Sequence, residues 1–93
     1  MNNKKIEKIR KNLDFLDDKL LNLIKKRTLL VNQILKEKKY KNQIVDKKRI
    51  NFILKKIRSK SIKKGVDQKV SKRIWNSMIR SFIDYEYRNF KKK

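Results

Sequence analysis

The sequence predicts an all-α protein: three helices in one chain, the first of them long, in a helical bundle closed by dimerisation. Apolar residues recur with the 3.6-residue period of a helix in three segments, and no segment keeps the period-two alternation of a strand. A chain of 93 residues buries only a modest core unless it pairs with another copy. Because no internal repeat or linker is visible, residues 1–93 are expected to form a single domain.

The first expected helix runs from about Lys4 to Tyr40, and its length favours packing against a partner along much of the helix. Its apolar seam consists of Ile6, Ile9, Leu13, Leu16, Leu20, Leu23, Leu30 and Ile34. Arg27 interrupts this seam at a position where the spacing requires an apolar side chain. An arginine there either disrupts a core or faces an anion inside it.

Two joints separate the three helices. The periodicity lapses over residues 41–45, after which Asp46 can cap a second helix. Gly65, the only glycine, falls where a helix C-terminus favours a left-handed residue, and Asp67 can cap the third helix. The second helix carries Ile50, Ile53, Leu54 and Ile57 on one face, and the third carries Val70, Ile74, Trp75, Met78, Ile79, Phe82 and Ile83.

The composition excludes several classes of chemistry. The chain has no cysteine and no histidine, which rules out disulfides, thiolate metal sites and the usual general base near neutral pH. We therefore expect neither a metal nor a cofactor. The N-terminal residues lack an apolar core typical of a signal peptide, and no apolar run is long enough to span a bilayer. No membrane partner and a cytoplasmic location are expected.

The formal net charge of +21 raises the possibility of nucleic-acid binding. Lysine, asparagine and isoleucine are abundant, whereas alanine and proline are absent, a bias that points to an AT-rich genome as the source of much of the lysine. The basic residues are also scattered along the whole chain. We therefore do not expect nucleic acid as a partner, although a non-catalytic basic module that binds nucleic acid or protein stays an alternative.

Two cations share one face of the first helix. Arg27 and Lys38 are eleven residues apart, which is three turns and a net rotation of only about 20°. Two inward-facing cations are costly unless an anion meets them. The alternative is that each side chain extends past its neighbours to solvent, which is the commoner behaviour for a lysine.

Two further arginines are candidates for a site. Arg10 lies roughly 25 Å along the helix from Arg27 of the same chain. If two copies of the first helix run antiparallel, Arg10 of one copy can approach Arg27 of the other. The alternative is that Arg10 is exposed and pairs with Asp14 or Glu7. Arg49 opens the second helix, where free N–H groups suit a polar ligand, or it is simply solvated.

Glu86 lies on the apolar side of the third helix, near Phe82 and Ile83. In its protonated form it can donate a hydrogen bond there. The alternative is a surface salt bridge with Arg88 or Arg80.

The chain from Ile6 to Glu86 resembles the all-helical chorismate mutase family, which is shared with isochorismate pyruvate lyases. The resemblance is carried by the opening IRKNLDFLDDKLLNLIKKR, by the lysine eleven residues after its last arginine, by VDKKR and by GVDQK. It implies an intertwined homodimer that converts chorismate to prephenate in phenylalanine and tyrosine biosynthesis. Each site would be completed by an arginine from the other chain.

The resemblance also implies roles for individual residues. Arg27 and the partner's Arg10 would bind the two carboxylates of chorismate, and Lys38 would reach a carboxylate and the ether oxygen of the breaking bond. Asp46 and Arg49 would organise the polar end around the ring hydroxyl, and Glu86 would contact the ether oxygen. We also count Phe82 among the substrate-binding residues.

One departure from the family pattern leaves the substrate open. The family usually has a glutamate immediately after the Arg49 position, where it binds the ring hydroxyl, and this chain has Ile50. An aliphatic residue there is similar to the isochorismate pyruvate lyase branch, whose products are salicylate and pyruvate. Chorismate mutase is the preferred interpretation, because Asp46 and Arg49 are both retained, and the lyase is the alternative.

Overall fold

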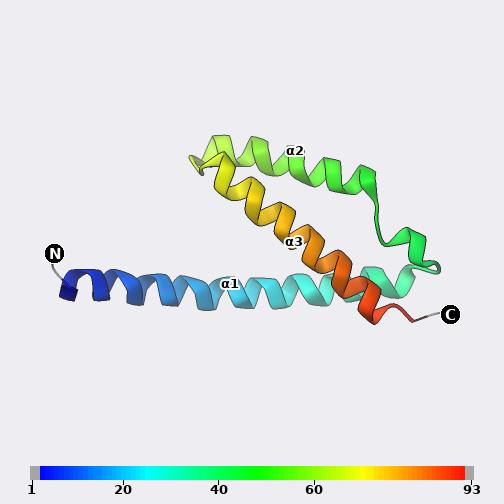
Figure 1. Ribbon diagram of the computed structural model, residues 1–93, viewed down its shortest axis with the longest axis horizontal. Coiled ribbons are helices and arrows are strands. Elements are labelled where there is room, and N and C mark those ends of the chain that lie inside the picture. The colour runs from blue at the N-terminus through cyan, green and yellow to red at the C-terminus, as the bar shows by residue number, and fades with distance from the viewer. Residues whose placement is uncertain (1–2, 92–93) are drawn as a thin grey trace. The chain divides into compact units, whose positions relative to one another are not determined.

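Three α-helices and one short 3-10 helix make up the part of the chain that the computed structural model describes, residues 3–91 (Figure 1). They are α1 (Asn3–Glu37), η1 (Lys41–Gln43), α2 (Lys47–Lys64) and α3 (Gln68–Asn89). No strand occurs within residues 3–91. The prediction of an all-α chain with one long N-terminal helix is therefore confirmed.

The chain divides into two compact units, Met1–Val31 and Asn32–Lys93. Helix α1 supplies the described part of the first unit and contributes its last six residues to the second. The single domain over residues 1–93 and the intertwined homodimer stay predictions.

In the N-terminal unit, the apolar seam of α1 is exposed along most of its length. Leu13 is 53% exposed, Leu20 54% and Leu23 58%. Ile9, Leu16 and Leu30 are exposed to a similar extent. A long helix whose apolar side chains remain in water gains little stability from its own chain, since tertiary packing supplies most helical stability.

In the C-terminal unit, α2 and α3 pack against each other as an antiparallel pair joined at Gly65 (Figure 1). The buried apolar residues are Leu35, Ile44 and Ile79. Half-buried apolar side chains include Ile53, Leu54 and Ile57 on α2 and Trp75, Met78 and Ile83 on α3. Polar contacts add to this core, because Ser61 Oγ donates to Ser71 Oγ at 2.7 Å between the two helices.

The predicted caps are present at both joints. Asp46 accepts a hydrogen bond from the Arg49 N–H at 3.0 Å, and Asp67 accepts one from the Val70 N–H at 3.0 Å. Gly65 ends α2 in the left-handed region with φ of 70°, and its N–H donates to the Ile62 carbonyl. These local signals fix where α2 begins and ends and where α3 begins.

Two details differ from the sequence-based expectation. Helix α1 ends at Glu37 and not at about Tyr40, because the N–H groups of Lys39 and Tyr40 donate to the Gln43 side chain and not to helical carbonyls. On α3, Val70 and Ile74 are each 52% exposed although they belong to the predicted apolar face. The buried part of that face lies further along the helix.

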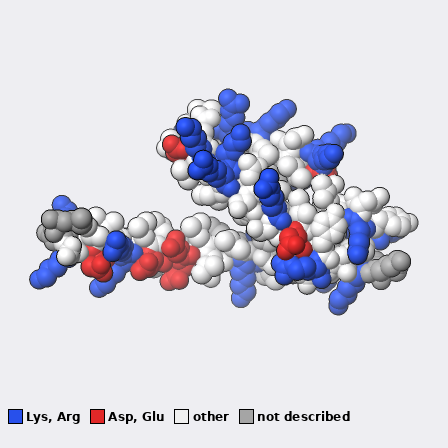
Figure 2. All heavy atoms as spheres, in the orientation of Figure 1, with Lys and Arg blue, Asp and Glu red and all other residues white. Residues whose placement is uncertain are grey.

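Charged side chains cover the surface without forming one block. On the face drawn in Figure 2, Lys and Arg appear over all three α-helices, as the scattered sequence pattern predicts. Among the described residues, no helix is both long and apolar enough to cross a membrane.

Candidate active site

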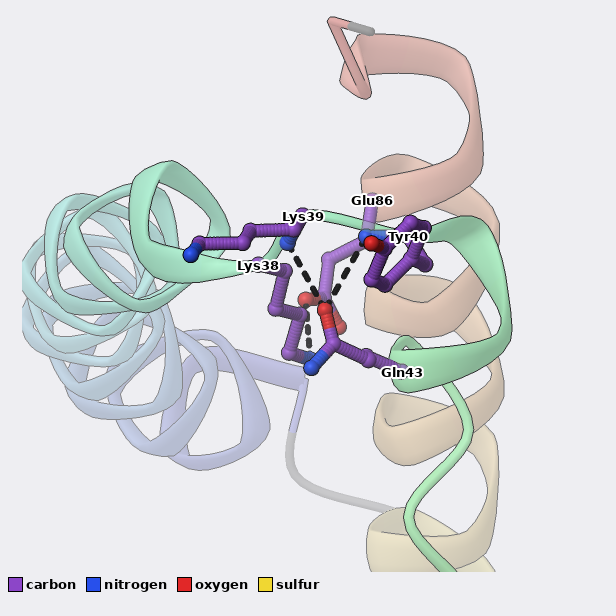
Figure 3. Close-up of polar contacts among 5 residues, drawn as sticks. All are labelled: Lys38, Lys39, Tyr40, Gln43 and Glu86. Atoms are coloured by element: carbon purple, nitrogen blue, oxygen red, sulfur yellow. Dashed lines mark hydrogen bonds and ion pairs between the residues drawn. The ribbon is translucent and has the colours of Figure 1, made fainter. Parts of the chain in front are cut away.

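Lys38 and Glu86 form the central contact of the candidate site. Lys38 Nζ donates to Glu86 Oε1 at 2.8 Å, and the two side chains are only 17% and 10% exposed (Figure 3). Lys38 directly follows α1, whereas Glu86 belongs to α3, so the fold joins residues 48 positions apart. An ammonium group carries three N–H donors, and this contact uses one of them.

The segment after α1 determines where Lys38 lies. The Lys38 N–H donates to the Leu35 carbonyl at 3.1 Å, which closes the last turn. Gln43 Oε1 then accepts from the N–H groups of Lys39 at 2.7 Å and Tyr40 at 3.0 Å (Figure 3). Ile44, only 3% exposed, anchors the end of this segment in the core. A hydrogen-bonded and anchored loop therefore carries the lysine.

The N-terminus of α2 borders the same region. An open hollow of about 600 Å³ is lined by Lys38, Gln43, Val45, Asp46, Lys47 and Lys48. The first turn of α2 offers backbone N–H groups and the positive end of the helix dipole, both of which favour an anion. A cationic side chain and a helix N-terminus thus border the same open hollow.

Two other predicted residues belong to the first turn of α2. The Arg49 guanidinium lies over the Phe52 ring, 5.3 Å from its centroid, so in this structure it stacks on an aromatic face. Ile50 is half-buried, and its N–H donates to the Asp46 carbonyl. The position therefore presents an aliphatic side chain with no group for hydrogen bonding to a ligand.

Aromatic residues of α3 lie next to Glu86. Phe82 is half-buried and meets the Tyr85 ring edge-on, with 6.2 Å between centroids. The Tyr85 hydroxyl donates to Asn32 Oδ1 on α1 at 2.8 Å. This part-buried hydrogen bond ties α3 to the end of α1 within the C-terminal unit, and so supports the contact between Lys38 and Glu86.

Arg10 and Arg27 lie in the N-terminal unit. Arg10 is exposed and forms a 3.5 Å ion pair with Glu7, one of the two local partners that the spacing allowed. Arg27 is half-buried on α1. Neither is placed relative to the C-terminal unit, so their expected roles stay predictions.

The alternative of a surface salt bridge for Glu86 with Arg88 or Arg80 is wrong. Glu86 is 8% exposed and its partner is Lys38, whereas Arg88 pairs with Asp84 at 2.9 Å. In this structure Glu86 Oε1 accepts a hydrogen bond from the Lys38 ammonium group. The sequence placed it correctly on the apolar side of α3 but did not identify its cation.

Sequence reasoning missed Gln43, which holds the loop and lines the hollow. The sequence carries only a weak signal for it: a glutamine within the segment 41–45 where the helical period lapses, and no glycine near that segment to end the helix. No group of His, Cys, Asp and Glu suited to a metal ion occurs among residues 3–91. The side chains present can bind an anion and stabilise negative charge that develops on an oxygen.

Comparison with known proteins gives one family. The family described as chorismate mutase type II matches residues 9–87, a range that includes every predicted site residue. No curated protein and no solved structure matched the chain.

Proposed function

Because the chain belongs to the chorismate mutase type II family, we propose that it rearranges chorismate to prephenate. The observation that carries the proposal is the Lys38 ammonium, held at 2.8 Å by Glu86 beside an open hollow at the N-terminus of α2. This arrangement suits a small anionic substrate, and chorismate is a dicarboxylate.

The reaction requires little of the side chains beyond position and charge. In this unimolecular pericyclic step the ether C–O bond breaks while a C–C bond forms, and no nucleophile or proton transfer is needed. The protein accelerates it by holding the enolpyruvyl side chain over the ring and by placing cations where negative charge grows on the ether oxygen. A chain without histidine or cysteine can supply both.

Lys38 is the residue that we assign to the ether oxygen. Glu86 uses one of its three N–H donors, which leaves two for a substrate carboxylate and the ether oxygen. Glu86 then holds the ammonium in place while its own charge offsets part of the cost of burying Lys38. Asp46 and Arg49 act at the polar end of the substrate, around the ring hydroxyl, and Phe82 contributes to the apolar wall.

Arg27 and Arg10 of the partner subunit bind the two substrate carboxylates in this proposal. The exposed seam of α1 supports a homodimer. Its leucines are more than half exposed, and fully burying an exposed leucine stabilises a protein by about 1.5–3 kcal/mol, so covering the seam would recover a part of this for each residue. An antiparallel second copy of α1 covers that seam and brings its own Arg10 towards Arg27.

Isochorismate pyruvate lyase is the second candidate, and Ile50 is the observation that favours it. The side chain after Arg49 is aliphatic and half-buried, so it offers no acceptor to the hydroxyl of chorismate. Isochorismate carries its hydroxyl elsewhere on the ring, and cleavage gives salicylate and pyruvate. The mutase is preferred because Asp46 and Arg49 both remain at this end of the site.

A product assay separates the two activities. The purified protein is incubated with chorismate and, separately, with isochorismate, and prephenate, salicylate and pyruvate are resolved by chromatography. We expect prephenate from chorismate, and none above the uncatalysed rate from a Lys38→Met variant. Salicylate and pyruvate from isochorismate, with little prephenate, would assign the lyase. No product from either substrate would refute both activities.

A further inference from the structure

Gln43 lies in the short segment between α1 and α2, and its side chain bonds to backbone and not to other side chains. Its Oε1 accepts from two consecutive N–H groups, those of Lys39 at 2.7 Å and Tyr40 at 3.0 Å. These are the first two residues after Lys38 (Figure 3). One amide oxygen therefore fixes both peptide units that follow the lysine.

These two N–H groups decide where α1 ends. In a continuing α-helix they would donate to carbonyls four residues earlier. The helical period of the sequence extends to about Tyr40, but the helix stops at Glu37. Helices commonly end at a glycine in the left-handed region, yet the only glycine of this chain, Gly65, ends α2. At the end of α1, Gln43 Oε1 accepts the hydrogen bonds of the Lys39 and Tyr40 N–H groups instead.

Gln43 itself is held firmly. Its N–H donates to the Tyr40 carbonyl at 3.1 Å, and the next N–H, of Ile44, donates to the Lys41 carbonyl at 3.0 Å. Ile44 is only 3% exposed, so the turn is anchored in the core of the C-terminal unit. The acceptor therefore sits on a fixed support and can determine the path of the chain at Lys38.

We propose that Gln43 is a positioning residue for Lys38: by ending α1 at Glu37 it directs the lysine towards Glu86 and the hollow. Without this acceptor, the N–H groups of Lys39 and Tyr40 return to helical carbonyls and α1 extends by up to a turn. Each added helical residue rotates the chain that follows by about 100°, which moves α2 and α3, and with them Glu86, away from their alignment with Lys38. The inference rests on the proposed function, in which Lys38 meets the reacting oxygen.

The test compares Gln43→Met with Gln43→Glu. Methionine keeps the length of the side chain but removes the acceptor, whereas glutamate keeps an acceptor oxygen. We expect Gln43→Met to lower kcat for prephenate formation by about 10–100-fold, since displacement of a reacting group by about 1 Å can cost that much. KM should change less than kcat, because Lys38 contacts a substrate carboxylate in the ground state as well, whereas its contact with the ether oxygen strengthens in the transition state.

Glutamate at this position should restore kcat to within about threefold of the wild type, whatever its added charge does to KM. Gln33→Met, at an exposed position on α1 outside the candidate site, is the matched control and should leave kcat unchanged. Equal loss of kcat in Gln43→Met and Gln43→Glu, or no loss in a folded Gln43→Met, would overturn the proposal.

A second readout does not depend on activity. In Gln43→Met the ¹³Cα chemical shifts of Lys39 and Tyr40 should move towards helical values, and in the wild type their amide hydrogens should exchange slowly. Unchanged shifts in a folded variant would overturn the role of Gln43. Wild-type exchange as fast as at exposed Lys91 would also overturn it, and this measurement does not require the variant to fold. If the wild type formed no product, the proposed function would fail, while these shifts would still report on the helix end.

Discussion

Replacing Lys38 by methionine should destabilise the protein through the carboxylate it leaves behind. At 2.8 Å, and with an effective dielectric constant of about 20, the gross attraction between Lys38 and Glu86 is about 6 kcal/mol. Desolvation of the two groups offsets much of this, and removal of one partner from a buried pair typically costs about 3–5 kcal/mol. Because the two side chains remain 17% and 10% exposed, we expect a loss of about 2–3 kcal/mol.

The carboxylate is the cause of that loss, so neutralising it should recover stability. Glu86→Gln in the Lys38→Met background should regain about 1–2 kcal/mol, although the same substitution alone should destabilise the wild type. The free energies of unfolding are measured for all four proteins by urea denaturation followed by circular dichroism. All four are measured at one protein concentration, because the proposed dimer would make stability depend on concentration. Additivity of the two substitutions within about 0.5 kcal/mol would refute an energetic coupling between these residues.

Three further predictions concern the site and its support. Arg27→Ala should abolish prephenate formation while leaving helicity and dimerisation largely intact, as measured by product assay, circular dichroism and sedimentation; loss of the fold would make Arg27 structural. Tyr85→Phe removes the 2.8 Å hydrogen bond to Asn32 and should lower the free energy of unfolding by about 1 kcal/mol, measured by urea titration. Tyr87 is 43% exposed, so Tyr87→Phe should leave the free energy of unfolding unchanged in the same titration. Gly65→Ala should lower the free energy of unfolding by about 1 kcal/mol, because a φ of 70° is strained for alanine although a Cβ there meets nothing within 4 Å. Asparagine tolerates the left-handed region better, so Gly65→Asn should lower it less, and equal losses of stability in the two variants would contradict this explanation.

Local chemistry made much of the fold predictable. Asp46, Gly65 and Asp67 each act through contacts within a few residues, so their capping roles could be inferred from sequence and are confirmed. The end of α1 was predicted wrongly because its determinant is a side-chain acceptor in the following loop, which periodicity does not register.

The site was predictable only in part. The burial of Glu86 follows from helical spacing, since it lies on the same side of α3 as its apolar neighbours. Its pairing with Lys38 depends on a contact over 48 positions, which the spacing within one helix cannot reveal. The family resemblance implies that both residues belong to one site, but it did not predict their ion pair.

The exposed seam of α1 has a consequence for how the protein responds to salt. In the proposed homodimer, two chains that each carry a formal net charge of +21 would repel one another as their seams came together. Raising the ionic strength from about 0.01 to 0.15 M shortens the Debye length from about 30 to 8 Å, which weakens this repulsion and should favour the proposed dimer. The same screening weakens the attraction of an anionic substrate to a basic surface. If the proposed homodimer is the active form, the two effects oppose each other, and we expect the rate per chain at low protein concentration to pass through a maximum as salt is added.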